Sequence, residues 1–548
     1  MLKTKISNSL KQIVEESVPI EIFIPENEKF GHYSTNLALR LAKSQGKNPM
    51  EIANGINEKL RIKNSELFSK TEVAAPGFIN FWLSEKILQD ELKEILKNKE
   101  NYGSLNLGEN KKVSIEFISA NPTGQLTIGN GRGGFLGDVL ARILEFGGYK
   151  VSREYYINNA KTSTQIKELG KTVLGQGQSY LTEDLKSKIL KFKNKIKNLK
   201  NKKIGNSEGE TGYLLANEIQ KENQKFIVKD LKIKFDRWFN KEDLYQSGAV
   251  KKLLEDLKKK KLVYEKEGAL WFKTKNFGDS EDRVLVRTPR LAGQAGEPTY
   301  FLPDLAYHLN KIKIRKFDEA IDIWGADHHG YLPRLKAGLK ALGISEDKLK
   351  AIITQLVRLK KGGEEVKMSK RTGEFITLKD LVEEAGLDAV RFFFLMSSPD
   401  THMDFDLDLA KEQSLKNPVY YVQYAAVRCG SILKKSQSAS PDRAGRRRIK
   451  PQTKIKFDLL TTPEDINLMR MLARFPEIVE AAVENYNPQV LVRFALDLAR
   501  GFHNFYEKER IIGEENDLMS ARLELLRATQ IIFRNIFGIL GLNFLNKM

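Results

Sequence analysis

The sequence predicts an α/β fold in which a parallel, doubly wound sheet lies between a small α+β segment and a helical bundle. Residues 112–118 are rich in β-branched and aromatic side chains, residues 132–146 carry apolar residues at helical spacing, and residues 151–157 again suit a strand. A strand, a helix and a second strand in about forty residues form the βαβ unit of a Rossmann-type sheet. From about residue 410 onward, Gly and Pro become rare within long amphipathic patterns, which indicates an all-α bundle.

The first hundred residues differ from both of these regions. Helical patterns at 33–42 and 49–60 precede a strand-like run at 71–82, which suggests a self-contained α+β segment. A lysine-dense run at 186–203 contains no acid and is expected to form an exposed insertion helix, with contact to a nucleic-acid backbone left open. The expected division is residues 1–108, residues 109–408 with a basic insertion near 160–290, and residues 409–548.

Composition restricts the class of protein. Lys and Arg exceed Asp and Glu by 91 to 71 over 548 residues, a net charge of +20, so a polyanionic partner is expected. A single cysteine, Cys429, excludes an intramolecular disulfide framework and a zinc site built from cysteines, and we expect no protein metal site. No apolar run reaches membrane-spanning length, and residues 1–16 read as an amphipathic helix, so we expect a cytoplasmic protein that does not bind membranes.

Two glycine-containing loops suit a nucleotide. Residues 119–131 form a loop of small residues before a helix, whose free N–H groups and dipole attract phosphate. Far downstream, Lys367 and Lys370 lie in a short run that is bracketed by Gly362, Gly363 and Gly373. Such lysines can close onto a triphosphate and neutralise charge on a leaving pyrophosphate.

The amino-acid sequences of both loops resemble those of one family. Ser119-Ala-Asn-Pro-Thr-Gly124 with Thr127-Ile-Gly-Asn-Gly-Arg-Gly133, and Val366-Lys-Met-Ser-Lys-Arg-Thr-Gly373, resemble the nucleotide motifs of class I aminoacyl-tRNA synthetases in their arginyl form. Further similar segments occur at residues 30–39, 75–80, 296–308, 324–330, 388–395, 404–408, 417–424 and 505–510, so the resemblance spans nearly the whole chain. It implies an arginine–tRNA ligase that uses ATP with Mg²⁺ to convert L-arginine to arginyl-adenylate, and transfers the arginyl group to the 3′ end of tRNA(Arg). We expect a monomer.

The resemblance also implies which residues act on ATP. The catalytic residues would be Lys367, Lys370, Thr127 and Asn130. The ATP-binding residues would be Ala120, Pro122, Thr123, Gly124, Gly129, Gly131, Gly325, Asp327, Met368 and Ser369. The family normally carries histidine at both positions where this chain has Thr127 and Asn130, whose hydroxyl and amide can still donate hydrogen bonds. Asn159-Ala-Lys161 also departs from the usual Asp-Ala-Gly, and the sequence offers no account of that change.

A second group of residues would select the amino acid. Tyr300 and Asp304 are four residues apart, where a strand is expected to end and a helix to begin. Both side chains can therefore lie at the opening of the same site. By resemblance, Glu116 and Asp304 bind the guanidinium with Tyr300 beside it, and Asn121 and His328 bind the α-amino and carboxylate end. Carboxylates suit a planar cation with five donors, which lysine cannot imitate. From the residues alone, Asp304 is equally compatible with an acid that complements a helix dipole.

The bundle would read the tRNA. Tyr420 and Tyr424 can stack on unpaired bases, with Gln423 and Arg428 reading base edges or phosphate, although tyrosines at this spacing also commonly pack a bundle. Two alternatives stay open at this point. A class I synthetase for another amino acid would share both nucleotide motifs but lack the Glu116 and Asp304 pair, and a non-catalytic RNA-binding relative is conceivable because both histidines are missing.

Overall fold

The computed structural model describes residues 1–14, 18–63, 66–198, 207–289, 296–366, 376–438 and 455–548. The chain forms two compact units, which are described separately. Unit 1 contains residues 1–105, 420–485 and 490–548, and unit 2 contains residues 106–419 and 486–489.

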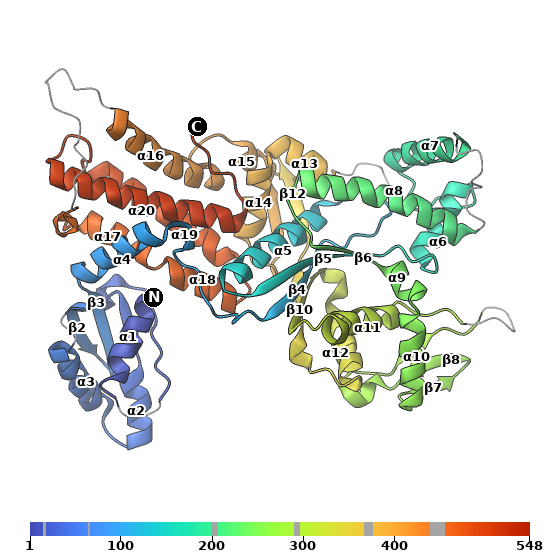
Figure 1. Ribbon diagram of the computed structural model, residues 1–548, viewed down its shortest axis with the longest axis horizontal. Coiled ribbons are helices and arrows are strands. Elements are labelled where there is room, and N and C mark those ends of the chain that lie inside the picture. Colours follow the sequence, from blue (N-terminus) through green and yellow to red (C-terminus); the bar gives the residue numbers. More distant parts are fainter. Residues whose placement is uncertain (15–17, 64–65, 199–206, 290–295, 367–375, 439–454) are drawn as a thin grey trace. The chain divides into compact units, whose positions relative to one another are not determined.

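A five-stranded parallel sheet forms the centre of unit 2, as predicted (Figure 1). In spatial order its strands are β11 (Leu349–Thr354), β10 (Glu319–Gly325), β4 (Lys112–Glu116), β5 (Lys150–Ile157) and β6 (Arg237–Asn240). All neighbouring strands run parallel. The chain proceeds from β4 to β6 on one side and places β10 and β11 on the other, so the strand order reverses between β4 and β10. In doubly wound sheets, ligands bind at the carboxyl ends of the strands that flank such a reversal.

Helices cover both faces of this sheet. Helix α5 (Ile128–Phe146) lies on one side, and α11 (Phe301–Leu309) and α12 (Leu332–Ala341) lie on the other (Figure 1). Helix α5 packs so closely that a Cβ on Gly137 would lie 2.2 Å from Cγ of Phe117. The prediction that this helix begins at residue 132 is wrong, because Thr127 caps it and so adds the first turn.

An insertion of three helices separates β5 from β6: α6 (Thr164–Leu174), α7 (Glu183–Asn198) and α8 (Glu208–Lys229). Helices α6 and α8 touch backbone to backbone. A Cβ on Gly170 would lie 1.8 Å from the carbonyl oxygen of Glu208, and one on Gly212 would lie 1.8 Å from that of Ile166. Helix α7 confirms the predicted lysine-rich helix, and Lys191 is exposed on it.

The second half of unit 2 surrounds the sheet with short elements. Between β6 and β10 lie α9 (Lys241–Gln246), α10 (Ala249–Lys259), an antiparallel sheet of β7 (Val263–Lys266), β8 (Ala269–Phe272) and β9 (Arg283–Val286), η3 (Thr274–Phe277), and η4 (Asn310–Ile314) after α11. After β10 come η5 (Ala326–Tyr331), η6 (Glu346–Lys348), β12 (Val357–Lys361), β13 (Glu364–Glu365), α13 (Leu378–Ala385), α14 (Leu387–Met396), β14 (Met403–Asp406) and α15 (Leu407–Lys411). One buried apolar cluster joins Phe301, Leu305 and Leu335 to Tyr156 and Leu253.

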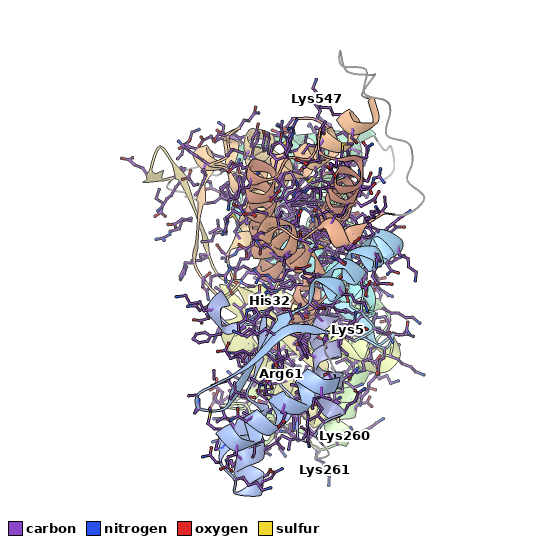
Figure 2. The ribbon with its side chains drawn as sticks, turned by 90° about the vertical axis from the view of Figure 1, so that its left-hand side faces the viewer. Lys5, His32, Arg61, Lys260, Lys261 and Lys547 are labelled. Atoms are coloured by element: carbon purple, nitrogen blue, oxygen red, sulfur yellow. The ribbon has the colours of Figure 1, made fainter. Side chains whose placement is uncertain are left out.

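The amino-terminal part of unit 1 is an α+β segment. Its elements are α1 (Leu2–Lys11), η1 (Glu28–Phe30), β1 (Tyr33–Thr35), α2 (Leu37–Gln45), α3 (Pro49–Lys63), β2 (Phe68–Ala74), β3 (Phe78–Leu83), α4 (Glu85–Asn98) and η2 (Lys99–Asn101). The predicted helix at 33–42 is wrong at its start, because residues 33–35 pair with β3 and the helix begins at Leu37. His32, labelled in Figure 2, directly precedes β1 and fixes the end of β3 by accepting a hydrogen bond from the Leu83 N–H at 3.0 Å.

The remainder of unit 1 is helical, as predicted. It contains α16 (Pro418–Ser438), η7 (Phe457–Leu459), α17 (Pro463–Ala473), α18 (Phe475–Glu484), α19 (Gln489–Lys508) and α20 (Asn516–Leu540). The Tyr33 hydroxyl donates to the Glu477 carboxylate at 3.0 Å and so ties the α+β segment to α18. Most of the predicted linker at 436–451 lies outside the described residues. Within the described ranges, none of the helices combines the length and apolar character that crossing a membrane requires.

Candidate active site

The loop after β4 is held in an unusual backbone conformation. Ile118 and Ser119 have φ values of 67° and 36°, a region that β-branched residues rarely occupy. Two contacts hold the loop: the Tyr155 hydroxyl bonds both the N–H and the carbonyl of Ala120, at 3.1 and 3.2 Å, and Ser119 Oγ accepts the Tyr156 N–H at 3.0 Å. The surrounding structure thus fixes the direction in which the chain leaves the sheet.

Thr127 and Asn130 form a capping box at the start of α5. Oγ1 of Thr127 accepts the Asn130 N–H at 3.3 Å and donates to Oδ1 of Asn130 at 2.9 Å. Oδ1 of Asn130 also accepts the Thr127 N–H at 2.9 Å. The acceptor of the Asn130 amide is therefore used by the helix, which leaves its NH₂ group as the donor that can face a ligand.

Other residues predicted to bind ATP line the same loop. The Gly124 carbonyl accepts from Asn223 Nδ2 at 3.1 Å, and the Thr123 N–H donates to the Asn121 carbonyl at 2.8 Å. Pro122 and Gly131 are buried, whereas Gly129 is exposed. Gly325 ends β10 at the other side of the strand-order reversal, and Asp327 follows it with an exposed carboxylate.

The predicted lysine run lies mostly outside the described residues. Lys367, Met368, Ser369 and Lys370 belong to that part of the chain. The segment that follows it is fixed against the first nucleotide loop: the Leu378 N–H donates to the Leu126 carbonyl at 3.0 Å, and Thr377 forms a β-bridge with Thr127.

A row of three acids crosses the sheet beneath this region. Asp322 of β10 is in register with Glu116 of β4, which is in register with Glu154 of β5, and all three side chains are buried. Lys311, which follows α11, places its ammonium 2.7 Å from Glu116 and 2.8 Å from Asp322. Arg315 donates to Glu154 at 2.8 Å. The acids are thus neutralised by cations from a single neighbouring segment.

His308 completes the network from the same segment. Its Nε2 lies 2.7 Å from an Asp322 carboxylate oxygen, and its Nδ1 lies 2.8 Å from the Asp304 carbonyl. Since both partners are acceptors, a doubly protonated imidazolium satisfies both contacts. Burial opposes the charged form, but Lys311 and His308 lower the pKa of Asp322 to about 2. Burial raises the pKa of Glu116, against the pull of the Lys311 ammonium.

Asp304 lies in the first turn of α11, within a group of tyrosines. Its Oδ2 accepts the Tyr331 hydroxyl at 2.8 Å, and its side chain retains 21% of its exposure. The buried Tyr156 hydroxyl has no hydrogen-bond partner among the described residues. Burial, together with the charges of Asp304 and Glu116, raises the pKa of Tyr156. Asp304 is therefore a partly accessible acid beside an unpaired buried hydroxyl.

The other residues predicted to bind the amino acid differ in how exposed they are. Tyr300 is exposed, and its ring centre lies 5.3 Å from that of Tyr331. Asn121 is exposed and accepts from Asn158 Nδ2 at 2.9 Å. His328 follows β10 with an exposed ring, 3.0 Å from the carboxylate of Asp327. Glu116 differs from all of these, because it is buried and already pairs with Lys311.

The structure explains why residue 159 is asparagine where the family usually has aspartate. Its buried amide donates to the Asn217 and Asn240 side-chain oxygens, each at 3.0 Å, and its Oδ1 accepts the Glu242 N–H at 3.4 Å. An aspartate could not donate these two hydrogen bonds. Asparagine therefore links β5, β6, α8 and α9 without burying a further negative charge.

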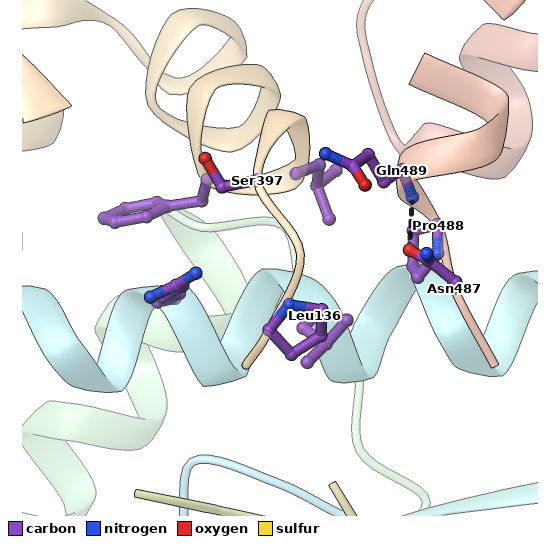
Figure 3. Close-up of a pocket in the computed structure, with 9 residues that line it drawn as sticks. Leu136, Ser397, Asn487, Pro488 and Gln489 are labelled. Atoms are coloured by element: carbon purple, nitrogen blue, oxygen red, sulfur yellow. Dashed lines mark hydrogen bonds between the residues drawn. The ribbon is translucent and has the colours of Figure 1, made fainter. Parts of the chain in front are cut away.

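A pocket of unit 2 lies away from these acids. It is lined by Leu136 of α5, by Ser397 after α14 and by residues 487–489, where the Gln489 N–H donates to Oδ1 of Asn487 at 3.0 Å (Figure 3). Arg132 lines it too, but its guanidinium already donates to the carbonyls of Gln355, Ser398 and Thr401, at 2.7–2.9 Å. Arg132 thus anchors the backbone around α14.

The residues predicted to bind tRNA lie on α16 in unit 1. Gln423 is buried, and Tyr420 and Tyr424 are half-buried. Tyr424 stacks on His503 of α19 with ring centres 5.7 Å apart, and Arg428 donates to the Tyr506 hydroxyl at 2.6 Å. Tyr424 and Arg428 therefore contribute to packing between α16 and α19.

Several residues around the acids were not predicted from the sequence. Lys311 and His308 follow Asp304 at intervals of one helical turn, a spacing that places them near one face of the helix. Tyr156 alternates with Glu154 on β5, so the strand pattern puts both on one face. Lys241 follows β6 far from Asp304 in sequence, and no sequence pattern links the two.

Comparisons with known proteins agree with this geometry. Family models match residues 1–83 (arginyl tRNA synthetase N terminal domain), 91–396 (tRNA synthetases class I (R), catalytic domain) and 422–548 (DALR anticodon binding domain). The chain is 42% identical to the arginine–tRNA ligase of Desulforamulus reducens, over 98% of this chain and 95% of that protein. It is 40% identical to the arginine–tRNA ligase of Bacillus subtilis, over 97% and 95% respectively.

Solved structures support the fold. The arginyl-tRNA synthetase of Thermus thermophilus matches with a TM-score of 0.76 at 22% identity, covering 100% of both chains. The arginyl-tRNA synthetase of Plasmodium falciparum matches with a TM-score of 0.73 at 19% identity, covering 100% of this chain and 98% of the other.

Replacing Lys311 tests the acid row. Lys311→Met leaves Glu116 and Asp322 buried without their ammonium, so we expect the free energy of unfolding in urea at pH 7 to fall by about 3–5 kcal/mol. Lys340→Met, which removes an exposed ion pair with Glu346, should cost at most about 1 kcal/mol. Because the lowered pKa of Asp322 stabilises the native protein above about pH 4 and ceases to do so as the pH falls toward about 2, the Lys311→Met loss should shrink at pH 3. Equal losses in both variants would contradict the role of Lys311.

Proposed function

The chain belongs to the class I arginyl-tRNA synthetases, and from that membership we propose how its residues divide the work of joining arginine to tRNA. The enzyme is an arginine–tRNA ligase: ATP activates arginine as arginyl-adenylate with release of pyrophosphate, and the arginyl group then passes to the 3′ end of tRNA. We propose that Mg²⁺ enters with ATP, and that the enzyme acts as a monomer in the cytoplasm on tRNA(Arg).

Asp304 carries the proposal for the arginine site. Its carboxylate is partly accessible, accepts a hydrogen bond from Tyr331, and lies near the end of β10 where the strand order reverses. We propose that Asp304 binds the guanidinium directly and that Tyr300 covers its face. Glu116 would contribute its charge from within the sheet rather than by direct contact, because its carboxylate shares Lys311 with Asp322. Asn121 and His328 would hold the α-amino and carboxylate end.

The start of α5 is the proposed phosphate site. Its N–H groups and dipole favour an anion, and the NH₂ of Asn130 adds a donor beside them. Lys367 and Lys370 would close on the same phosphates. Lys370 precedes Thr377 by seven residues, a span of at most about 25 Å, and Thr377 is bridged to Thr127, so Lys370 can reach the loop. Pre-positioned donors of this kind stabilise charge as pyrophosphate leaves.

The remaining parts would bind tRNA. We propose that residues 1–108 and 409–548 bind the tRNA while residues 109–408 carry out both chemical steps. Tyr420, Tyr424 and Arg428 are the proposed contacts on α16, since each keeps partial exposure, and Gln423 would act through bundle packing. Charging of purified tRNA with labelled arginine tests the whole proposal. Pyrophosphate exchange that depends on a different amino acid would overturn it.

Asp304→Asn tests the arginine site. The amide keeps the size and one acceptor but loses the charge, so we expect KM for arginine in ATP–pyrophosphate exchange to rise about 10- to 150-fold, as loss of a charged hydrogen-bond partner costs about 1.5–3 kcal/mol. KM for ATP should stay within about twofold. The exposed Asp347→Asn variant is the matched control and should leave both values unchanged. Equal increases in both KM values would indicate a structural role instead.

Asn130→Asp separates capping from phosphate binding. The carboxylate keeps the acceptor of the capping box at a helix N-terminus, so thermal stability should be retained or slightly raised. The new negative charge replaces the proposed NH₂ donor, so KM for ATP should rise about tenfold or more. An unchanged KM for ATP would show that Asn130 serves the helix alone.

Lys370→Ala tests the lysine run. Loss of an ammonium that stabilises the leaving pyrophosphate should lower the rate of arginyl-adenylate formation by about 10²–10³-fold. Binding of tRNA, measured by filter retention, should change little because unit 1 would supply most contacts. Lys379→Ala, an exposed lysine of α13, is the control. Full adenylate formation in Lys370→Ala would remove this residue from the mechanism.

A further inference from the structure

Lys241 is a buried cation beside the proposed arginine site. It is the first residue of α9, directly after β6, and only 5% of the residue is exposed. Its ammonium lies 3.9 Å from Oδ1 of Asp304. That oxygen is the one not used by Tyr331. Lys241 thus faces the part of the carboxylate that is available to a ligand.

The contact between these two groups is incomplete. A separation of 3.9 Å is too long for a hydrogen bond, and the ammonium makes none with the residues that the structure describes. An ammonium has three donors and is strongly hydrated in water, so holding it largely out of water without a short partner is costly. Lys241 is therefore held near Asp304 without the short, hydrogen-bonded geometry that would make the pair a strong structural link.

Aromatic side chains around the pair suit a cation. The Lys241 ammonium lies 6.0 Å from the centre of the Tyr156 ring, and the Tyr156 hydroxyl is buried without a partner. Tyr331 and Tyr300 flank Asp304 on the other side. One acid, several aromatic faces and an unused hydroxyl form a setting for a flat cation, and a cation of the chain itself already occupies its edge.

We propose that Lys241 is a resident cation of the arginine site, which competes with the guanidinium for Asp304 and thereby sets the affinity for arginine. This inference rests on the proposed role of Asp304. When a guanidinium binds Oδ1 of Asp304, the Lys241 ammonium becomes a like charge a few ångströms away. It must then move aside or give up its proton, and either event weakens arginine binding.

Burial of Lys241 favours proton release. Burial lowers the pKa of Lys241, and Asp304 opposes that shift. Among the described residues, its titratable neighbours are Asp304 of α11 and Tyr156 of β5, with Tyr331 of η5 bonded to Asp304, and Glu242 and Tyr245 lie on α9 itself. Guanidinium bound to Asp304 cancels the one charge that holds the Lys241 proton. Because the guanidinium stays charged throughout, its attraction to Asp304 should increase as the pH rises through the pKa of Lys241.

Lys241→Met tests the inference. Removing the competing charge should lower KM for arginine in ATP–pyrophosphate exchange about tenfold at pH 7, with KM for ATP unchanged. In the native enzyme KM for arginine should fall more with rising pH than in Lys241→Met, where the α-ammonium of arginine still titrates but residue 241 does not. Lys241→Arg, which keeps a charge that cannot titrate, should show the native KM or a higher one at pH 7 and should follow the pH dependence of Lys241→Met. The exposed Lys251→Met variant of α10 is the matched control.

The outcomes separate this inference from the proposed function. A KM for arginine that is unchanged or raised in correctly folded Lys241→Met, judged by thermal unfolding, overturns the competition. If Asp304→Asn raises KM for arginine in the same assays, the arginine site stands and only the role of Lys241 fails. If Asp304→Asn leaves KM for arginine unchanged, both the site and the inference fail.

Discussion

The row of buried acids across β10, β4 and β5 is the constraint on which the site depends. Three carboxylates in register on neighbouring strands repel one another, and Lys311, Arg315 and His308 together oppose that repulsion. All three side chains come from α11 and the residues that follow it. The electrostatic requirement of the sheet therefore fixes the position of that helix, and with it the acid at its start.

This arrangement explains why a site for a cation can exist above so many acids. If Glu116, Glu154 and Asp322 were uncompensated, they would attract any cation or take up protons. Because their charges are opposed from within the protein, Asp304 is left as a partly accessible acid beside the tyrosines. In the proposed arginine site, this acid and its tyrosines would select a flat cation. At the proposed nucleotide site, Thr127 and Asn130 likewise have two roles. They cap the start of α5, and they lie beside the N–H groups of that helix end.

The sequence could predict the sheet because its evidence was local. The strands of the βαβ unit, the helix between them and the lysine-rich α7 all follow from periodicity, and the helical end of the chain follows from the scarcity of Gly and Pro. The start of α5 was misplaced because four glycines in its first two turns hide a helix that Thr127 caps. Residues 33–35 were misassigned because strand pairing with β3 overrode the local helical pattern.

The candidate site was predictable only in part, for the same reason. Motifs pointed to Asp304, Tyr300 and the glycine loop, but Lys241 and Tyr156 reach Asp304 through strand order, which no local pattern encodes. Glu116 shows the converse. The family resemblance made it a ligand of the guanidinium, yet a lysine nearly two hundred positions away along the chain already pairs with it.

The glycine contact between α6 and α8 affects how this insertion can change during evolution. Because Gly170 and Gly212 let two backbones touch, any larger residue at either position would force the helices apart. The exposed lysines of α7 carry no such restriction. Mutation can therefore redistribute the positive charge of this surface freely, while the helix pair that supports it tolerates almost no variation.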